Sequence, residues 1–410
     1  MTEIVLATVL LTLVVLTLTL LVMGARGIFQ PARPVEITVN GKTRINATTG
    51  AKLLSILNGA NVPVPSACAG AGTCGLCRVR IPEGGGDPLP TETARLGVND
   101  IHSGLRLACQ VVVRDALAVE VPEDMLAAER WQCTVLSNTM LAPLIKEIVL
   151  ALPAGTGFSF RAGAFVQITA PPHALDFATV EVDASCAASW DKFGWRRLKV
   201  ASDEPASRAY SIANRPADTE QGRLVLNVRL AVPSPGAADD ASPGIVSSYL
   251  FGARAGAKIL ASGPFGDFHV QDTGREMILI GGGVGMAPLR CIIFDELERK
   301  QTRRKMSFWY GARSSADVFY AGEFAALAER HANFAWTVAL SDPDPRAGAW
   351  PGPVGFIHEV LYRDCLKDHP APEDCEFYLC GPPLMIQAVM AVLEDVGVGS
   401  ESIYFDDFGG

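Results

Sequence analysis

The chain has 410 residues, more than one hydrophobic core normally holds, so its length predicts two to four domains. Apolar residues make up 49% and charged residues 19% of the sequence, which excludes a chain dominated by disorder. The formal net charge is −9 and there is no long basic run, which excludes the electrostatic surface of a typical nucleic-acid-binding protein.

An uncharged apolar segment runs from Ile4 to Met23. Its length matches what a helix needs to cross the roughly 30 Å hydrocarbon core of a bilayer, so we expect a single transmembrane helix. A cleaved signal peptide, which would have a positive start and a shorter apolar stretch, and a helix buried in a soluble core are the alternatives. Arg26 and Arg33 follow the segment while Glu3 precedes it, so the positive-inside bias places the rest of the chain in the cytoplasm.

Beyond this segment the hydrophobic pattern changes twice. An alternating strand pattern at 35–39, strand-like runs at 110–113 and 117–121, and a hairpin turn at Asn40-Gly41 indicate a small β-rich domain. Short strands with Gly and Pro turns then indicate an antiparallel barrel, interrupted by an insertion at about 172–206.

The last pattern alternates strand and helix and indicates a parallel sheet with crossover helices. The sequence thus predicts a multidomain α+β and α/β protein. Its segments are an anchor and linker at 1–34, a β-grasp-like domain at 35–129, a barrel at 130–272 and a parallel-sheet domain at 273–410.

Four of the ten cysteines form a pattern, and they are Cys68, Cys74, Cys77 and Cys109. Three share one glycine-rich loop with the spacing C-x5-C-x2-C, and the fourth follows 31 intervening residues later. Iron-sulfur clusters are held by Cys thiolates, and the segment resembles 2Fe-2S ferredoxins with a loop one residue longer than the plant type. We expect these four to bind a 2Fe-2S cluster. A structural zinc is the alternative, but zinc sites usually pair two C-x2-C knuckles and only one is present. Coincidental buried cysteines are a further one.

The run Arg208-Ala209-Tyr210-Ser211 resembles the Arg-x-Tyr-Ser signature of the ferredoxin-NADP reductase superfamily. The resemblance implies a bound FAD, with Arg208 at its pyrophosphate, Tyr210 against the isoalloxazine ring and Ser211 near the reactive N5. A guanidinium suits phosphate because it offers paired donors. An empty barrel is the alternative.

Two later landmarks stand in the order that the same superfamily has. The segment with Gly244, Val246 and Ser247 resembles its helix N-terminus at the flavin phosphates, a natural anion site. The run 263–266, Gly-Pro-Phe-Gly, resembles the turn that closes its barrel.

A buried strand pattern at 277–280 leads into a glycine-rich turn. The turn is not the G-x-G-x-x-G fingerprint, because Met286 stands where the third glycine belongs, but it resembles the version of the reductase superfamily. The predicted nucleotide-binding residues here are Gly281, Gly282, Gly283, Gly285 and Met286.

Cys380, Gly381 and Pro382 follow another strand pattern, at 376–379. The superfamily places a Cys there beside the nicotinamide ring, so these three are also predicted to bind the nucleotide. A small buried residue is the alternative reading of Cys380. Arg313 could meet an adenosine ribose or a 2′-phosphate, so NADH over NADPH rests on the resemblance.

Phe408 lies near the end of the chain, where side chains are ordered only if something holds them. In the superfamily a C-terminal aromatic commonly covers the flavin face that the nicotinamide must reach. We therefore expect Phe408 to bind the flavin and to gate hydride transfer, and to be catalytic together with Ser211 and Cys380. Phe405 is the competitor, although its alternation with Tyr404 predicts a final strand.

The order of the modules resembles the family of the F subunits of Na⁺-translocating NADH:quinone oxidoreductases, over the whole chain. The resemblance implies an electron-input subunit on a bacterial inner membrane. Such a subunit oxidises NADH by hydride transfer to FAD, then passes single electrons to a 2Fe-2S cluster and on to partner membrane subunits and quinone. One uncharged helix offers no carboxylate for an ion path, so sodium pumping is not assigned to this chain itself.

Two other functions stay open. A reductase component serving an oxygenase uses the same three cofactor modules, but the anchor argues against it. A structural subunit that has lost its cofactors would require the cysteine cluster and the Arg-x-Tyr-Ser run to be accidental.

Overall fold

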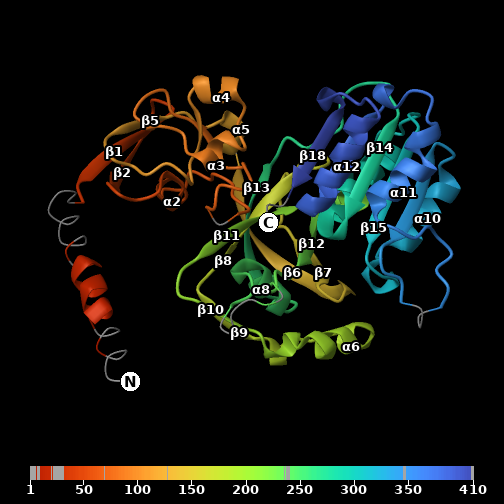
Figure 1. Cartoon of the computed structure of the whole chain (residues 1–410), viewed down its shortest axis with the longest axis horizontal. Helices are drawn as coiled ribbons and strands as arrows, with labels where there is room; N and C mark the ends of the chain where they lie inside the picture. Colours follow the sequence, from red (N-terminus) through yellow and green to blue (C-terminus); the bar gives the residue numbers. More distant parts are fainter. Residues whose placement is uncertain are drawn as a thin grey trace. The chain divides into compact units, whose positions relative to one another are not determined.

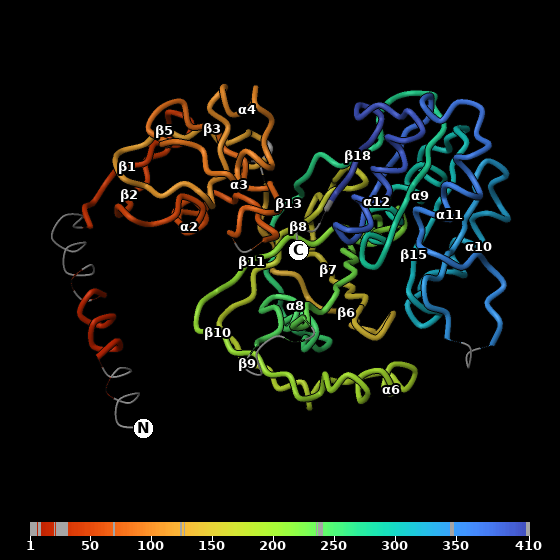
Figure 2. The backbone as a smooth tube through the Cα atoms, in the orientation of Figure 1, coloured from red at the N-terminus to blue at the C-terminus, as the bar shows by residue number. Residues whose placement is uncertain are grey.

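The computed structural model describes residues 6, 10–19, 21, 32–68, 70–126, 128–234, 236, 241–344 and 348–407, with the backbone alone at 124 and 407. Contacts divide the chain into two compact units. Unit 1 comprises residues 1–64 and 77–122, and unit 2 comprises residues 65–76 and 123–410. Figures 1 and 2 trace the elements of both units.

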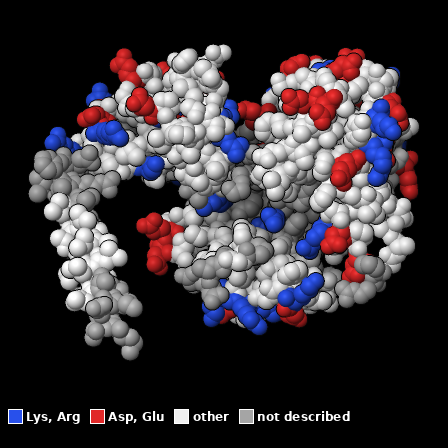
Figure 3. Space-filling model, in the orientation of Figure 1, with Lys and Arg blue, Asp and Glu red and all other residues white. Residues whose placement is uncertain are grey.

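The described part of the apolar N-terminal segment is helical, at 10–19 and at Leu6 and Leu21. Figure 3 shows this helix free of charged side chains. Its large apolar side chains are exposed, from 48% for Val14 to 72% for Leu6. Within the described residues, no helix combines the length and the apolar character that a membrane crossing requires. The predicted transmembrane segment 4–23 lies partly outside the described residues.

Unit 1 is built on a mixed sheet of three strands. Strand β1 (Pro34–Val39) pairs antiparallel with β2 (Thr43–Thr48) and parallel with β5 (Leu117–Val119). Asn40 and Gly41 turn the chain between β1 and β2 with φ of 49° and 66°, which confirms the predicted hairpin.

Short elements complete unit 1. They are α2 (Leu53–Gly59), β3 (Arg78–Arg80), α3 (Pro90–Thr93), α4 (Val98–His102) and β4 (Leu105–Leu107), with β3 and β4 paired antiparallel. The predicted strand at 110–113 is wrong, because Val112 makes only an isolated bridge to Lys52. Val111 and Val113 are buried, but their carbonyls accept from the amides of Leu53 and Gly50, in the irregular approach to α2.

Unit 2 contains an antiparallel barrel of six strands in the order β11-β8-β13-β6-β7-β12. The strands are β6 (Glu129–Ala142), β7 (Ile145–Ala151), β8 (Phe165–Ala170), β11 (Ala206–Ser211), β12 (Arg223–Arg229) and β13 (Lys258–Phe265). A bridge between Ile212 and Leu226 joins the two ends of this order. Helices α5 (Glu123–Leu126) and α7 (Pro216–Glu220) lie before β6 and β12, and α8 (Ile245–Gly252) lies before β13.

The insertion predicted at 172–206 separates two strands that pair directly, β8 and β11. It forms its own pair of strands around short helices, which are β9 (His173–Asp176), η1 (Phe177–Thr179), α6 (Ala184–Phe193), η2 (Trp195–Arg197) and β10 (Lys199–Ser202). The turn predicted at 263–266 is instead the end of β13, with an irregular register between Ser262 and Phe265. A bulge bends the strand there without ending it.

The second part of unit 2 is a parallel sheet in the order β16-β15-β14-β17-β18, as the strand-helix alternation predicts. Its strands are β14 (Met277–Gly282), β15 (Met306–Ala312), β16 (Phe334–Leu340), β17 (Glu376–Gly381) and β18 (Ile403–Asp407). Its longer helices are α9 (Met286–Phe294), α10 (Ala321–Arg330), α11 (Ile357–Asp364) and α12 (Pro383–Asp395). Leu279 faces a core shared with α9 and α10, while Ile278 and Ile280 face one shared with α11 and α12. The sheet is thus covered on both faces.

A close seam joins the barrel to this sheet. Gly163, just before β8, has φ +96°, and a Cβ at this position would lie 1.8 Å from the carbonyl oxygen of Phe268 and 3.3 Å from Ile292 of α9. Arg290 of α9 donates to the carbonyl oxygen of Ala213, which follows β11. Only glycine fits at position 163, because the segment before β8 lies directly against the backbone of the segment that connects β13 to β14.

Candidate functional site

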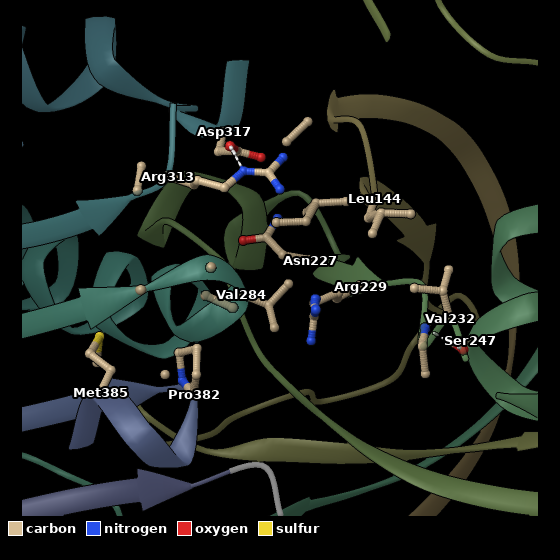
Figure 4. A pocket seen from close by; sticks show the side chains of 18 of the residues that line it. Leu144, Asn227, Arg229, Val232, Ser247, Val284, Arg313, Asp317, Pro382 and Met385 are labelled. Carbon is tan, nitrogen blue, oxygen red and sulfur yellow. Dashed lines mark hydrogen bonds and ion pairs between the residues drawn. The ribbon is translucent and has the colours of Figure 1, made fainter. Parts of the chain in front are cut away.

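A cavity of about 1030 Å³ lies in unit 2 and is lined by residues of both sheets. One wall comes from β11, β12 and the start of α8, and the other from the carboxyl ends of β14, β15 and β17. Ligands of open parallel sheets bind at that end of the strands, and the volume is at the upper end for small-molecule sites. Figure 4 shows apolar side chains such as Leu144, Val232 and Val284 facing the same space as Arg229 and Arg313.

The predicted flavin residues Arg208, Tyr210 and Ser211 all line this cavity from β11. Burial lowers the pKa of Arg208 and raises that of Tyr210. The Arg208 guanidinium donates to the carbonyl oxygen of Ser207 at 2.6 Å. A half-buried cation that faces a neutral acceptor attracts an anionic ligand.

Gly244, Val246 and Ser247 line the cavity at the start of α8. The Ser247 hydroxyl donates to the Gly244 carbonyl at 3.0 Å and accepts from the amide of Ala231 at 3.3 Å. A Cβ on Gly244 would lie 2.8 Å from that hydroxyl oxygen, so the turn requires glycine.

On the side of the parallel sheet, Gly282, Gly283, Gly381 and Pro382 line the cavity. Four other predicted binding residues do not, and they are Gly281, Gly285, Met286 and Cys380. The two glycines serve packing, because a Cβ on Gly285 would lie 1.9 Å from the Cys380 carbonyl oxygen and one on Gly281 would lie 2.8 Å from the Leu289 side chain. Cys380 and Met286 are fully buried.

Phe408, the predicted flavin cover, lies outside the described residues. The strand predicted for Tyr404 and Phe405 is confirmed as β18, which runs parallel to β17 with Asp407 opposite Gly381. Phe405 is 46% exposed.

Asn227 is a lining residue that the sequence analysis did not identify. Its amide nitrogen donates to the Tyr320 hydroxyl at 2.8 Å, and that hydroxyl donates to Glu147. Among the described residues its oxygen Oδ1 has no hydrogen-bond partner, although the residue is only 4% exposed. The available signal was one polar residue at the centre of an apolar strand, 224–228.

Tyr320 holds this arrangement in a rarely populated backbone conformation, with φ +58°. The guanidinium of Arg290 lies 4.3 Å from the centre of its ring and is paired with Glu323 at 2.8 Å. Burial, together with the neighbouring Glu147 carboxylate, raises the pKa of Tyr320 well above its ordinary value, so the hydroxyl stays a donor. Such backbone conformations persist where surrounding contacts over-determine them, and they gather at functional sites.

Arg313 lines the cavity at the end of β15, and its guanidinium lies 3.7 Å from Asp317. Figure 4 shows the pair facing the cavity opposite Val284. The side chain is 58% exposed, so this ion pair contributes little and leaves Arg313 available to a ligand.

The predicted cluster ligands lie on two segments. Cys68 and Cys74 belong to unit 2, with sulfur atoms 3.4 Å apart, and the amide of Ala67 donates to the Cys74 sulfur. Cys77 and Cys109 belong to unit 1 and are buried. All ten cysteines are described and none forms a disulfide. Two unbridged thiols in contact suit a shared metal centre, because thiolates are the ligands of iron-sulfur clusters.

The glycines of the cysteine loop take a backbone conformation that favours glycine. Gly70, Gly72 and Gly75 have φ of 85°, 82° and 68°, a region that L-residues rarely adopt. The amide of Ser66 donates to the side chain of Gln167 at 3.1 Å, which attaches the loop to β8.

Relatives that match over the full length identify the family of the chain. The F subunit of the Na(+)-translocating NADH-quinone reductase of Yersinia pseudotuberculosis is 48% identical to it over 410 residues, which is 100% of both chains. The proteins of the same name from Klebsiella pneumoniae and Yersinia enterocolitica are 48% and 47% identical over the same length. The chain belongs to the family of these F subunits. This confirms the family that the order of modules predicted.

Two family models match parts of this member of the F-subunit family. The model of the 2Fe-2S iron-sulfur cluster binding domain matches residues 37–114, and that of the oxidoreductase NAD-binding domain matches residues 279–391. The cytochrome P450 reductase of Amycolatopsis is 28% identical with a TM-score of 0.60, covering 91% of this chain and 98% of its own. A ferredoxin reductase of a carbazole 1,9a-dioxygenase, 21% identical with a TM-score of 0.59 over 92% of this chain and 99% of its own, shares the fold.

Proposed function

We propose that this chain is the electron-input subunit of a Na⁺-translocating NADH:quinone reductase. It oxidises NADH by hydride transfer to FAD and passes the electrons singly to a 2Fe-2S cluster. One observation carries the proposal. In a chain with F-subunit relatives over its full length, the Arg-x-Tyr-Ser run and the glycine turn of the nucleotide sheet line the same cavity.

The residues of the barrel wall suit a flavin dinucleotide. Arg208 offers its guanidinium to a phosphate, and the free amides at the start of α8 favour negative charge. Tyr210 offers an aromatic face to the ring, and Ser211 offers a hydroxyl to its reactive edge. FAD, when bound, supplies the change from a two-electron to a one-electron carrier.

The residues of the opposite wall suit NADH. Gly282 and Gly283 allow a pyrophosphate to approach the backbone, and Gly381 and Pro382 border the place for the nicotinamide. The apolar side chains Leu144, Val232 and Val284 exclude water from this space. Gly281, Gly285, Met286 and Cys380 act from behind this wall in the proposal, by holding the turn in place.

We further propose that Cys68, Cys74, Cys77 and Cys109 ligate the 2Fe-2S cluster. Ala67, beside Cys68, lines the cavity that also contains Tyr210, so the cysteine loop of unit 2 borders the flavin site. Phe408, which follows the end of β18 closely in sequence, keeps its proposed role as a mobile cover of the flavin.

The division into segments at 1–34, 35–129, 130–272 and 273–410 is also part of the proposal. The exposed apolar helix at 10–19 supports a single-pass anchor, with the remaining domains on the cytoplasmic side of a bacterial inner membrane. Partner membrane subunits would take the electrons onward to quinone.

The decisive experiment is purification of the full chain from detergent-solubilised membranes of its own cell. We expect FAD, two irons per chain, co-purifying multispan subunits and NADH-driven quinone reduction. Recovery with an oxygenase and no quinone activity would favour the reductase component of an oxygenase and overturn the proposal. Deleting residues 1–26 should release a protein that still reduces ferricyanide with NADH. An inactive product that is folded and flavin-loaded would contradict a purely anchoring role.

A further inference from the structure

The amino-terminal edge of the parallel sheet brings three side chains of different chemistry together. Lys305, Glu276 and Cys375 each immediately precede one of the neighbouring strands β15, β14 and β17. The amide of Met277 donates to the Lys305 carbonyl at 2.9 Å, and the amide of Glu376 donates to the Glu276 carbonyl at 2.8 Å, so the three strand starts are in register. The nucleotide cavity lies at the carboxyl ends of the same strands, so this edge is a separate place.

His369 reaches this edge from the loop between η7 (Leu366–Asp368) and η8 (Pro372–Asp374). Its Nε2 atom lies 3.4 Å from Oε2 of Glu276 and 3.7 Å from the sulfur of Cys375. All three ligand atoms lie within 4.8 Å of one another. Cys375 is 2% exposed, and the side chains of His369 and Glu276 are 11% and 18% exposed.

The two separations measured from Nε2 of His369 are those of ligands around one tetrahedral ion. With zinc bonds of about 2.1 Å to nitrogen and oxygen and about 2.3 Å to sulfur, tetrahedral angles place N and O about 3.4 Å apart and N and S about 3.6 Å apart. We propose that Glu276, His369 and Cys375 form a binding site for Zn²⁺ or a similar borderline-soft divalent cation. Thiolate, imidazole and carboxylate together favour zinc over magnesium or calcium, which take oxygen ligands. Water or the neighbouring thiol of Cys365 completes the coordination.

The backbone that carries Cys375 is fixed in advance. The guanidinium of Arg275 donates to the carbonyl oxygens of Glu373, Asp374 and Cys375 at distances from 2.7 to 2.8 Å. A ligand loop that is already ordered loses little entropy when the ion binds.

The protons must balance when the ion enters. Burial, with Glu276 and Cys365 nearby and Lys305 and Arg275 opposing, raises the pKa of Cys375 to about 12, so its thiol loses a proton to water on binding. The amide of Ala371 donates to Nδ1 of His369 at 3.3 Å, so Nε2 carries the ring proton in the metal-free protein. Metal binding moves that proton to Nδ1 at the cost of this long hydrogen bond.

Lys305 opposes the ion. Its ammonium lies 3.0 Å from Oε1 of Glu276, the oxygen that does not face His369, and its side chain is 70% exposed. The ammonium can move into water when the ion binds, but its charge weakens binding. Removing that charge should strengthen binding several-fold.

The test is zinc titration of the full-length protein with flavin and iron-sulfur cluster bound, at pH 7.5, by calorimetry and by metal analysis after desalting. We expect one zinc per chain, with affinity reduced at least tenfold in both His369→Gln and Cys375→Ala. His331 and Cys186 lie outside the proposed zinc site. The variants His331→Gln and Cys186→Ser should therefore bind zinc as the unmodified chain does. Equal zinc binding by all four variants, or none by the unmodified chain, would overturn the proposal.

A variant at the exposed Lys305 tests the site even if the variants at buried residues fail to fold. Lys305→Ala should fold normally and bind zinc more tightly, and its difference from the unmodified chain should shrink at high salt. An unchanged affinity in Lys305→Ala would also overturn the site. Cys365→Ser distinguishes the fourth ligand, because a weaker affinity assigns it to the thiol and an unchanged affinity assigns it to water.

Discussion

The side-chain nitrogen of Asn227 donates to the Tyr320 hydroxyl across 2.8 Å, and the same hydroxyl donates to Glu147. The chain of donors fixes the orientation of the Asn227 amide, because only its nitrogen can donate to Tyr320. Its oxygen is thereby left for the cavity, where among the described residues it has no hydrogen-bond partner. A buried acceptor of this kind is satisfied by a ligand or by water.

Asn227→Ala should therefore weaken ligand binding. Losing one hydrogen bond in a buried site costs about 1 to 2 kcal/mol, so we expect the dissociation constant of FAD or of NADH to rise about tenfold. The two constants can be measured by flavin fluorescence and by rapid mixing. Asn333→Ala is the control, because the Asn333 side chain donates to the carbonyls of Thr302 and Arg304 and does not line the cavity. If both constants stay unchanged in Asn227→Ala, the amide has only a structural role.

Cys74→Ala should abolish the paramagnetic signal of the reduced iron-sulfur cluster. The rate of flavin reduction by NADH should stay within about twofold of that of the unmodified chain, because Cys74 does not line the cavity. Freeze-quench spectroscopy after mixing with NADH separates the two steps. Cys186→Ser, in the insertion helix α6, should keep both the paramagnetic signal and the rate of flavin reduction. A persistent signal in Cys74→Ala would remove this cysteine from the site.

Glu92 and Arg106 form a buried ion pair at 2.7 Å in unit 1. Burial alone would raise the pKa of Glu92, but hydrogen bonds from Arg106 and from the amides of Leu89 and Leu107 outweigh it and hold the pKa below its ordinary value. The pair's stabilisation is therefore present above the unfolded pKa of about 4.3 and is lost as the pH falls through the lower folded pKa.

Glu92→Gln should destabilise unit 1 by about 3 to 5 kcal/mol near neutral pH, because it leaves a buried guanidinium without its counter-charge. The temperature at which the cluster absorbance is lost should fall by several degrees and depend less on pH below 5. Glu120→Gln, which breaks an exposed pair with Arg80 at 3.7 Å, should cost at most about 1 kcal/mol. Equal losses in the two variants would mean that burial of the pair does not matter.

Phe408→Ala tests the proposed flavin cover. We expect a change of at least threefold in the rate of flavin reduction, in the apparent affinity for NADH, or in the preference between NADH and NADPH. The loss of a side chain that must move aside alters access to the flavin. Phe405→Ala is the matched control, because Phe405 already lies in β18. These quantities can be measured by rapid mixing. If all three stay the same in Phe408→Ala, Phe408 does not cover the flavin.

Short runs of sequence were enough to predict the parallel sheet and to point to residues that line the cavity. The strand that ends at Gly282 and the run from Arg208 to Ser211 carry their information within a few residues, and the structure brings both to one cavity. Gly285 was misjudged because sequence shows that a glycine is needed but not for which neighbour. Its neighbour is the Cys380 carbonyl, 95 positions further on.

The residues that were missed depend on contacts between distant segments. The orientation of the Asn227 amide depends on hydrogen bonds with Tyr320 and, through it, Glu147, which lie on other elements. The valine run at 110–113 predicted a strand, yet a strand also needs a regular partner, and there the partner is the irregular segment 50–53. Burial periodicity and hydrogen-bond pairing are separate properties. Only burial periodicity can be read from a short stretch of sequence.

The seam at Gly163 bears on how such reductases can be recombined. A chimera that takes the barrel from one relative and the nucleotide sheet from another must keep the close approach of position 163 to Ile292 of α9, because a Cβ on Gly163 would lie 3.3 Å from that side chain. The same chimera must preserve Arg290 opposite Ala213, with one partner on each side of the exchange. Natural exchange of modules is therefore expected to move barrel and nucleotide sheet as one inherited cassette, with viable crossover points nearer to residue 129 than to residue 272.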